Sequence, residues 1–277
     1  MTQLNRPLFW EKKFKMRNQI KYTLGAIASI PFLPIMYFQS RKIKRTIPQL
    51  PEATGTEGFE GHSPHQINLL TLGESTIAGV GVDSHKNGFT GALAKTLSQG
   101  SDFQVNWKVF AKSGYTAKQV ALELIPKIKN FQPDIIVIGL GANDAFNLHS
   151  PKRWRAGMNE VLTKLNNKFP NAKIVCNNMP PIKEFPAFTP IMKKVIGNLV
   201  ELFGSELDKM VKNYNNVSYI NEKMTLDNWI NKFDLNLTRN DFFSDGVHPS
   251  KLTYQTWGME VANFILNNNK MELFTGK

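Results

Sequence analysis

The sequence alternates short apolar runs with longer segments of helical periodicity, and this alternation constrains the fold more than any other feature. The apolar runs have the length of strands and lie at residues 67–72, 105–110, 135–140, 173–176 and 217–220. The run at 135–140 is apolar throughout, which is typical of a central strand covered on both faces. Strands that alternate with helices favour a parallel sheet with helices on both sides. The sequence therefore predicts an α/β fold.

Helical patterns fill the spaces between these runs. The last of them follows Pro249 and Ser250, which suit a helix start. In a parallel sheet of this kind, ligand sites gather beyond the carboxyl ends of the strands. The expected helices lie at residues 86–99, 116–130, 151–169, 190–213 and 251–268.

The chain has 277 residues, enough for one large α/β domain with an appendage. Residues 1–46 read as a basic and apolar N-terminal segment. Residues 47–65 are rich in proline, glycine and glutamate, and we interpret them as a linker. The α/β domain is expected to occupy residues 66–277.

The net charge of +12 is concentrated at the amino terminus. The first 50 residues carry ten of the 34 Lys and Arg side chains and a single acid, Glu11, so they account for +9 of the total. The remaining chain is therefore close to neutral. Basic side chains that are confined to one end of the chain do not indicate a nucleic-acid-binding groove across the fold. We therefore expect no nucleic-acid partner.

The single cysteine, Cys176, excludes an internal disulfide and a cysteine-based zinc site. It lies in an apolar run, where a free cysteine is most often a buried core residue.

An apolar stretch at residues 22–38 lies between the basic side chains. As a helix it would extend roughly 26 Å, against a hydrocarbon core of about 30 Å. Pro31 and Pro34 would break or kink such a helix. Tyr22 and Phe38 stand at its ends, where aromatic residues anchor helices at a membrane interface.

Three interpretations of this stretch remain open: a short transmembrane anchor, an interfacial segment lying on anionic lipid, and a helix packed on its own domain. A cleaved signal peptide fits less well, because the small-residue pattern at 26–28 falls inside the apolar run. We expect attachment to a membrane, the inner membrane of a bacterium. Basic residues on both flanks leave the side of the membrane open.

Ser75 stands at the end of the first expected strand, after Gly73 and Glu74. A serine in this place is often only a cap or a turn residue, but its hydroxyl would also lie at the edge where ligands bind. Gly79 and Gly81 follow and suggest a phosphate loop. No lysine follows in Walker spacing, and the dinucleotide fingerprint is absent, so we discount a nucleotide cofactor.

The next two strands run into Gly114 and into Asn143-Asp144. A glycine lets a backbone N–H approach a substrate closely, although it could equally be a turn residue. Asn143 could cap the following segment. Alternatively, its amide could stabilise a developing oxyanion together with the N–H groups of Ser75 and Gly114.

Asp245 and His248 lie three residues apart in one turn near the carboxyl end. Aspartate is often just a turn former. In this turn, however, its carboxylate could reach Nδ1 of His248 and fix the tautomer that accepts a proton from Ser75. Serine, histidine and aspartate in mutual reach are the parts of an acyl-transfer triad.

Together these blocks resemble the SGNH/GDSL family of serine hydrolases over residues 66–268. The family usually has Gly-Asp-Ser in the first block, and here Glu74 replaces the aspartate, which puts the geometry of that turn in question. The matching blocks are Gly73-Glu74-Ser75, Gly114, Gly141-x-Asn143-Asp144 and Asp245-x-x-His248-Pro249.

The resemblance implies a three-layer α/β/α, flavodoxin-like fold with a five-stranded parallel sheet. It also implies ester hydrolysis through an acyl-enzyme, with neither a cofactor nor a metal. Carried over, Ser75 is the nucleophile, His248 the general base and then acid, and Asp245 its orienting residue. The N–H groups of Ser75 and Gly114 and the side chain of Asn143 would form the oxyanion hole.

The substrate is less constrained. Phe185 and Phe188 lie in a proline-rich stretch that would line an acyl pocket or else seal the loop against the domain. Glu74 and Val247 are further candidates for substrate contact.

We expect a carboxylic ester hydrolase of the esterase, lipase or lysophospholipase type, acting on a small-molecule or lipid-like ester. One alternative is an O-acetylesterase for carbohydrates, or a thioesterase, on the same fold. Another is an inactive binding protein at the membrane surface, against which the intact Ser75, Asn143, Asp245 and His248 argue.

Overall fold

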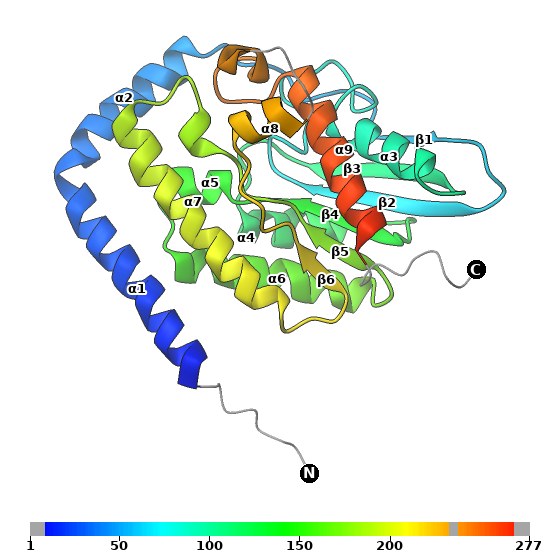
Figure 1. Ribbon diagram of the computed structural model, residues 1–277, viewed down its shortest axis with the longest axis horizontal. Coiled ribbons are helices and arrows are strands. Elements are labelled where there is room, and N and C mark those ends of the chain that lie inside the picture. Colours follow the sequence, from blue (N-terminus) through cyan, green and yellow to red (C-terminus); the bar gives the residue numbers. More distant parts are fainter. Residues whose placement is uncertain (1–8, 233–237, 269–277) are drawn as a thin grey trace.

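The computed structural model describes residues 9–232 and 238–268, which fold around one six-stranded sheet (Figure 1). The strands follow the order β1-β3-β2-β4-β5-β6. Strands β2 to β6 are parallel, and β1 pairs with β3 in the antiparallel direction at one edge. Their bounds are β1 Glu57–Glu60, β2 Gln66–Gly73, β3 Gln104–Ala111, β4 Ile135–Gly139, β5 Lys173–Cys176 and β6 Val217–Tyr219.

The predicted fold class is confirmed. The five parallel strands match the five apolar runs to within a residue at each end, and their order, β3-β2-β4-β5-β6, is that of flavodoxin-like sheets. The sheet has six strands rather than the five expected, because residues 57–60 add the antiparallel strand β1.

Helices cover both faces of the sheet (Figure 1). One face carries α3 (Phe89–Gln99), α8 (Leu226–Lys232) and α9 (Lys251–Asn267). The other carries α5 (Ala142–Phe146), α6 (Pro151–Lys168) and α7 (Pro190–Val211). Short turns η4 (Ile182–Glu184) and η5 (Arg239–Phe242) lie in the late loops.

The helix expected at 116–130 is irregular. It begins as α4 (Ala117–Gln119), widens into a π-helical turn, η2 (Val120–Leu124), and ends in a tight turn, η3 (Ile125–Lys127). Pro126 accounts for the break, because it lacks an N–H and its ring clashes with the preceding turn.

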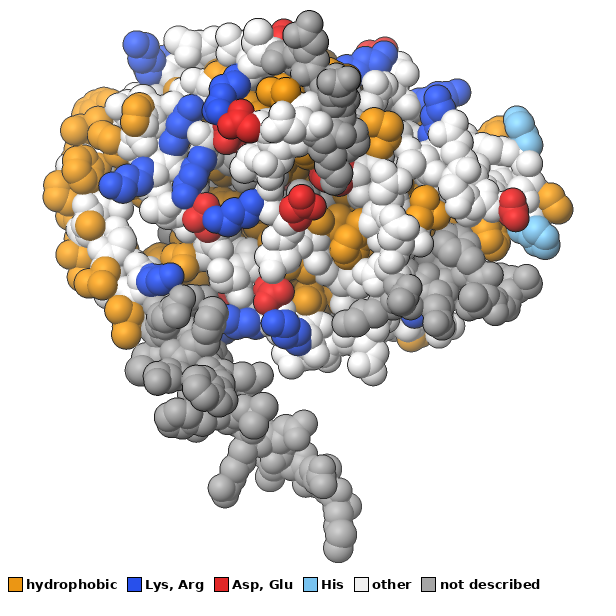
Figure 2. All heavy atoms as spheres, viewed as in Figure 1, with side chains coloured by type: hydrophobic (Ala, Val, Ile, Leu, Met, Phe, Trp, Pro, Cys, Tyr) orange, Lys and Arg blue, Asp and Glu red, His pale blue; other side chains and the backbone are white. Residues whose placement is uncertain are grey.

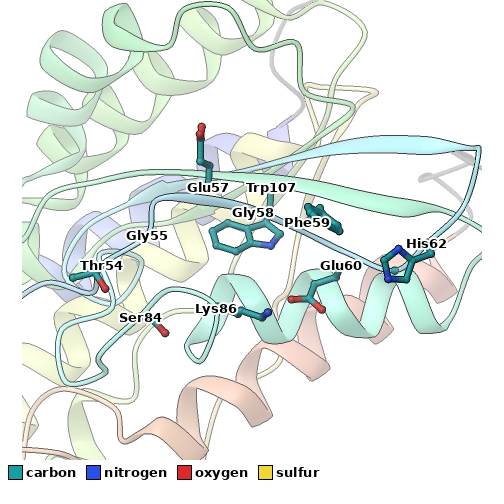
Figure 3. Close-up of a pocket in the computed structure, with 11 residues that line it drawn as sticks. Thr54, Gly55, Glu57, Gly58, Phe59, Glu60, His62, Ser84, Lys86 and Trp107 are labelled. Atoms are coloured by element: carbon teal, nitrogen blue, oxygen red, sulfur yellow. The ribbon is translucent and has the colours of Figure 1, made fainter.

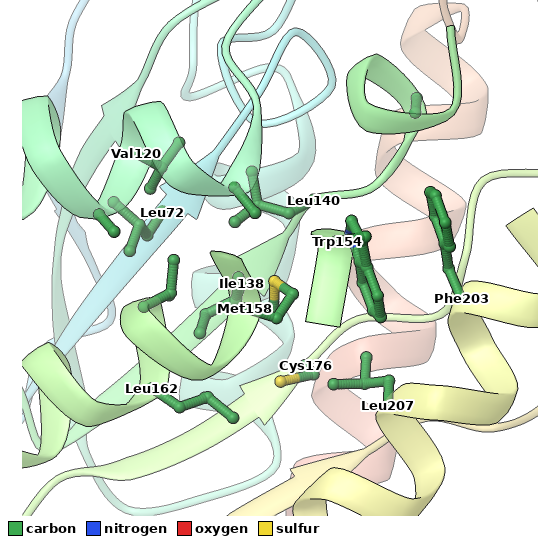
Figure 4. Packing of buried hydrophobic residues seen from close by; sticks show 14 of the residues in the cluster. Leu72, Val120, Ile138, Leu140, Trp154, Met158, Leu162, Cys176, Phe203 and Leu207 are labelled. Atoms are coloured by element: carbon green, nitrogen blue, oxygen red, sulfur yellow. The ribbon is translucent and has the colours of Figure 1, made fainter. Parts of the chain in front are cut away.

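Side chains at alternate positions of a strand point to opposite faces of the sheet, and they contribute to two apolar cores, one on each face. Leu70 and Leu72 of β2 point into the core beneath α6 and α7, whereas Leu69 points into the core beneath α3 and α9. In the first core Trp154 stacks on Phe203 with ring centroids 4.8 Å apart (Figure 4). Both faces are buried, which explains why the central strands are apolar at consecutive positions.

The amino-terminal part forms α1 (Phe9–Ser29), the short turn η1 (Ile30–Phe32) and α2 (Leu33–Thr46). Pro31 lies in η1 and Pro34 in the first turn of α2, so a short 3-10 turn separates the two α-helices there. Among the described residues, Gln19–Thr46 is the one helical stretch long and apolar enough to cross a membrane, and only 6% of its most apolar window is buried. Such a stretch is typical of a membrane span or a signal anchor.

The linker expected at residues 47–65 is built into the domain. Strand β1 pairs with β3, and Ala53 is buried, with its N–H donating to the carbonyl of Ala78 at 2.9 Å. The low apolar content of this segment concealed an edge strand, because an edge strand has few side chains to bury.

Gly73→Ala tests the close approach of β2 and β4 at the edge where the candidate site lies. A methyl group at this position would overlap the carbonyl oxygen of Gly139 and lie 2.5 Å from Cγ1 of Ile77. Overpacking of this kind typically costs about 1–3 kcal/mol, so we expect urea unfolding to show a loss of stability in that range.

Gly25→Ala is the matched control, since no atom lies within 4 Å of the added methyl group. It should stay within about 1 kcal/mol of the wild type. Equal stability of Gly73→Ala and the wild type would contradict the packing described for the strand ends.

Candidate active site

Three loops start from the same level of the sheet. Gly73, the last residue of β2, is in register with Ala111 of β3 on one side and Gly139 of β4 on the other. Ser75, Gly114 and Asn143 therefore follow within two to four residues of one common edge. The predicted convergence of these loops is a consequence of strand register.

Ser75 lies half-buried in a tight turn. The carbonyl of Glu74, the residue before it, accepts hydrogen bonds from the N–H groups of Ile77 and Ala78 at 2.9 and 2.8 Å. These bonds fold the chain back immediately after the strand, so the serine stands at the top of the turn.

Asp245 and His248 form a hydrogen-bonded pair. Oδ2 of Asp245 lies 2.7 Å from Nδ1 of His248. The other oxygen, Oδ1, accepts the N–H groups of Val247 and His248 at 2.9 and 2.7 Å. The Asp245 side chain is fully buried, whereas that of His248 is 22% exposed.

The charge of Asp245 is well stabilised. Burial raises the pKa of this carboxyl, but the hydrogen bonds from the ring and the backbone N–H of His248 outweigh it, and the pKa lies below its ordinary value. An ionised carboxylate at Nδ1 leaves Nε2 as the ring nitrogen that can exchange a proton with a substrate or a nucleophile.

The turn that holds His248 packs against the loop that follows Ser75. Ser244 Oγ donates to the carbonyl of Gly81 at 3.3 Å, and the Tyr254 hydroxyl donates to the carbonyl of Val80 at 2.9 Å. In the described part of the chain no hydrogen bond joins Ser75 to His248. The two residues are brought to one edge, and the hydroxyl is not already engaged by the ring.

Both loops line one small apolar hollow. Thr76, next to Ser75, and Val247, next to His248, face it together with Phe185. The remaining lining residues are Pro180, Pro181, Met224, Leu226, Phe243, Pro249, Thr253 and Trp257. The hollow has a volume of only about 20 Å³ and is lined by the neighbours of Ser75 and His248 in sequence, so it has room for a small apolar group of an ester.

Of the residues predicted to contact substrate, Phe185 and Val247 line this hollow. Phe188 does not. It is 8% exposed and packs edge-on against Phe185 and Phe146, with ring centroids 5.4 and 5.7 Å away. It therefore supports Phe185 from behind.

The loops that carry Gly114 and Asn143 are tied together. Asn143 Nδ2 donates to the carbonyl of Tyr115 at 3.1 Å, which uses one of its two amide hydrogens. Gly114 is exposed, has φ of +85° and has open space on its side-chain side. A positive φ of this kind favours glycine, and the open side leaves room for a ligand.

Glu74 was expected to be a substrate contact, and the structure corrects this. Its carboxylate is buried, and its two oxygens accept the N–H groups of Ala142 and Asn143, each at 2.8 Å. These are unpaired donors at the start of α5, the position where helices favour a negative charge. Glu74 thus fixes the backbone of Asn143 instead of facing a ligand.

Burial raises the pKa of Glu74 to about 7. The N–H groups of Asn143 and Ala142 act in the opposite direction, and the nearby Asp144 adds to the increase. The group is therefore poised to change its charge near neutral pH.

A second aspartate–histidine pair, which the sequence did not predict, stabilises the loops that carry Gly114 and Asn143. Oδ1 of Asp144 lies 2.8 Å from Nδ1 of His149, and Oδ2 accepts the N–H of Ala117 at 2.8 Å. Asp144 is buried. It connects the loop after β4 to the loop after β3, and the Asn-Asp sequence after an apolar strand was the signal for it.

Glu52 was also missed, because it lies in the supposed linker. Its carboxylate accepts the N–H of Ser113 at 2.8 Å and lies 3.2 Å from the Lys112 ammonium. These two contacts stabilise the loop that precedes Gly114.

A separate hollow of about 440 Å³ lies beside β1, in front of the start of α3 (Figure 3). Trp107, Lys86 and Glu60 are among its lining residues, and the indole N–H of Trp107 has no partner among the described residues. None of the predicted site residues lines this hollow.

In the two described stretches of the chain, no group of three or more His, Cys, Asp and Glu side chains is arranged to hold a metal ion. Cys176 lies buried in β5, and burial raises the pKa of its thiol to about 12. It is a core residue, as its sequence context predicts.

The profile of the GDSL-like Lipase/Acylhydrolase family matches residues 69–261, and the chain belongs to that family. It is therefore an ester-bond hydrolase with a three-layer fold. No protein with a curated description matches the chain.

Several solved structures share the fold. A Parabacteroides merdae protein described as a GDSL-like lipase is 18% identical, with a TM-score of 0.56, and covers 73% of this chain and 98% of its own. TesA is 20% identical, with a TM-score of 0.51 and coverages of 70% and 94%. The psychrotrophic esterase EstA from Pseudoalteromonas is 22% identical, with a TM-score of 0.50 and coverages of 73% and 99%.

Glu74→Gln tests the positioning role of the buried carboxylate. Glutamine offers one acceptor and one donor group, so one N–H at the start of α5 loses its partner, at a cost of about 1.5–3 kcal/mol. We expect kcat for p-nitrophenyl acetate to fall about ten- to a hundredfold, with KM changed less than about threefold. Glu57→Gln, on an exposed side chain paired only with Lys108, should retain wild-type kinetics.

The same carboxyl should leave a signature in stability. Its pKa rises from 4.5 unfolded to about 7 folded, so its contribution is complete below pH 4.5 and is lost as the pH rises through 7. Relative to wild type, Glu74→Gln should therefore gain about 2 kcal/mol in unfolding free energy between pH 5 and pH 6.5. Urea unfolding at both pH values measures this.

His85→Asn serves as the control of opposite sign. Burial lowers the pKa of His85 from 6.5 to about 4, so its contribution is complete above pH 6.5 and is lost as the pH falls through 4. Relative to wild type, this variant should lose stability between pH 5 and pH 6.5. A pH-independent difference for Glu74→Gln would contradict a raised pKa.

Proposed function

We infer that this protein is a serine esterase that acts through an acyl-enzyme, with Ser75 as nucleophile, His248 as base and Asp245 as the residue that orients His248. The observation that carries this inference is the Asp245–His248 pair, held at 2.7 Å in a turn that shares an apolar hollow with the loop of Ser75.

In the first half of the reaction, Ser75 Oγ attacks the ester carbonyl carbon while His248 Nε2 takes the hydroxyl proton. Asp245, whose charge is stabilised by backbone N–H groups, stabilises the imidazolium. The tetrahedral intermediate collapses, the carbon–oxygen bond to the alcohol breaks, and the departing oxygen takes the proton from His248. The acyl group is then bonded to Ser75.

In the second half, a water molecule repeats the attack. His248 takes a proton from the water, the acyl–serine bond breaks, and the proton returns to Ser75 Oγ, which releases the acid. No other group is consumed in either half.

The negative oxygen of each tetrahedral intermediate requires hydrogen-bond donors. The N–H groups of Ser75 and Gly114 and the free amide hydrogen of Asn143 supply them. Support comes from the hydrogen bond between Asn143 and Tyr115, which keeps the Asn143 side chain beside the Gly114 loop. Loss of one such donor typically costs about 3–4 kcal/mol of barrier.

The acyl group lies in the apolar hollow between Phe185 and Val247, and the substrate is a small-molecule or lipid-like ester. The protein is membrane-associated through residues 22–38 and their basic flanks. Support comes from the exposure of this helical stretch, in whose most apolar window only 6% of the residues are buried.

Ser75→Ala should abolish hydrolysis of p-nitrophenyl acetate, with kcat lowered at least about a thousandfold, because the nucleophile is lost. Asp245→Asn should lower kcat about a hundredfold or more, since it favours the wrong histidine tautomer. Ser205→Ala, at a half-buried position of α7 where the hydroxyl donates to the Glu201 carbonyl of the same helix, is the control and should retain full activity. Activity retained in Ser75→Ala would contradict the proposed nucleophile.

A series of p-nitrophenyl esters from acetyl to dodecanoyl separates the two candidate substrate classes. Rates that rise with chain length favour a lipid-type ester in the apolar hollow. A sharp maximum at acetyl favours an O-acetylesterase, the activity named for a structural neighbour, an acetyl xylan esterase that is 17% identical.

A further inference from the structure

Helices α1 and α2 carry most of the exposed apolar surface of the described chain. Of the fourteen large apolar side chains that are exposed, nine lie between Ile20 and Phe38. Leu24, Ile27 and Phe38 are each more than half exposed. Figure 2 shows these side chains gathered along one edge of the molecule. A patch of this extent marks a surface for a membrane or a partner.

The opposite side of the same two helices is docked on the folded domain. The side chains of Gln19–Thr46 that are partly or fully buried are Tyr22, Ser29, Met36, Gln39, Ser40 and Ile43. Met36 is 6% exposed and belongs to the core beneath α6 and α7, against which Tyr22 and Ile43 also pack. Residues three, four and seven positions apart form one stripe along a helix, so the docking extends over both helices.

This docking bears on how the helices meet a membrane. A helix that crosses a bilayer is surrounded by lipid over about 30 Å of its length. Here α1 contacts α7, and Tyr22, Met36 and Ile43 pack on the core, so lipid cannot surround the helix pair on that side. The bend at Pro31 and Pro34 also divides the stretch into two shorter helices. An in-plane arrangement satisfies both observations.

The docked helices adjoin the catalytic edge. Gln39 of α2 accepts a hydrogen bond from the Thr189 hydroxyl at 2.8 Å. Two residues earlier, the N–H of Ala187 donates to the carbonyl of Gly246, inside the turn that holds Asp245 and His248, at 3.1 Å. The loop that lines the apolar hollow is therefore bonded to the anchor on one side and to the catalytic turn on the other.

The exposed apolar surface continues beyond the helices. Phe146, the last residue of α5, and Leu148, just after it, are 37% and 41% exposed. Phe146 packs against Phe188, one residue before Thr189. Exposed basic side chains lie at the ends of the same surface, among them Lys21, Arg41 and Lys42. Apolar residues rimmed by cations match the interface of an anionic bilayer.

We propose that α1 and α2 lie in the plane of one leaflet of an anionic membrane, docked on α7, and hold the catalytic edge against that same leaflet. The substrates are then amphiphilic esters dissolved in this leaflet. The substrate class in this inference rests on the proposed esterase function. The in-plane orientation of α1 and α2 can be tested without that function.

The topology test uses the full chain with one epitope tag at each end, bound to sealed vesicles of phosphatidylcholine and phosphatidylglycerol. Both tags should be digested together by external protease, because both ends lie on one side. If one tag is protected while the other is cut, the helix spans the bilayer and the proposal is overturned. Failure to bind these vesicles also overturns it. Hydrolysis of p-nitrophenyl acetate by the same sample reports separately on the esterase function.

A variant that combines Leu24→Gln, Ile27→Gln and Phe38→Gln tests whether the exposed apolar surface of α1 and α2 gives the protein access to esters in the membrane. These side chains lie outside the docking stripe, so the fold should be retained. We expect at least tenfold weaker vesicle binding and a matching loss of activity on a long-chain ester embedded in the vesicles, with p-nitrophenyl acetate hydrolysis within twofold of wild type. Leu122→Gln, on an exposed leucine elsewhere, is the matched control.

Undiminished activity of the triple variant on the embedded ester would overturn the proposal. If the wild-type protein does not hydrolyse p-nitrophenyl acetate, the proposed esterase function is overturned instead. The result of the topology test remains valid in that case.

Discussion

The register of the three central strands is the constraint on which the candidate site depends. Gly73 pairs with Ala111 and Gly139, so β2, β3 and β4 end at one level and release three loops side by side. The absence of a side chain at Gly73 allows this close approach. The fourth loop, with Asp245 and His248, joins them through contacts of Ser244 and Tyr254 with the backbone after Ser75.

Within this edge, buried carboxylates hold the backbone. Glu74 binds the two N–H groups at the start of α5, Asp144 binds the N–H of Ala117, and Asp245 binds those of Val247 and His248. Each carboxylate replaces water at a donor that the fold would otherwise leave unpaired. The loops owe their shape to these bonds as much as to apolar packing.

The sequence predicted the parallel strands because burial on both faces makes them apolar without interruption. It predicted the Asp245–His248 pair because three residues in a turn bring two side chains together. It did not predict the role of Glu74, because the N–H groups that donate to its carboxylate lie almost seventy residues away, nor β1, whose edge position demands few apolar residues. It did not predict the pairing of His149 with Asp144, because Asp144 lies within the short helix α5 and His149 in the loop that follows it.

The central claim is that the Ser75 hydroxyl at this edge is the nucleophile of an ester hydrolase. The most direct measurement is reaction of the full-length protein with a fluorophosphonate probe, followed by mass spectrometry of its peptides. One equivalent of probe should attach to the peptide that contains Ser75, and labelling should disappear in Ser75→Ala and fall sharply in His248→Ala. An unlabelled protein, or a label carried by another residue, would contradict the claim.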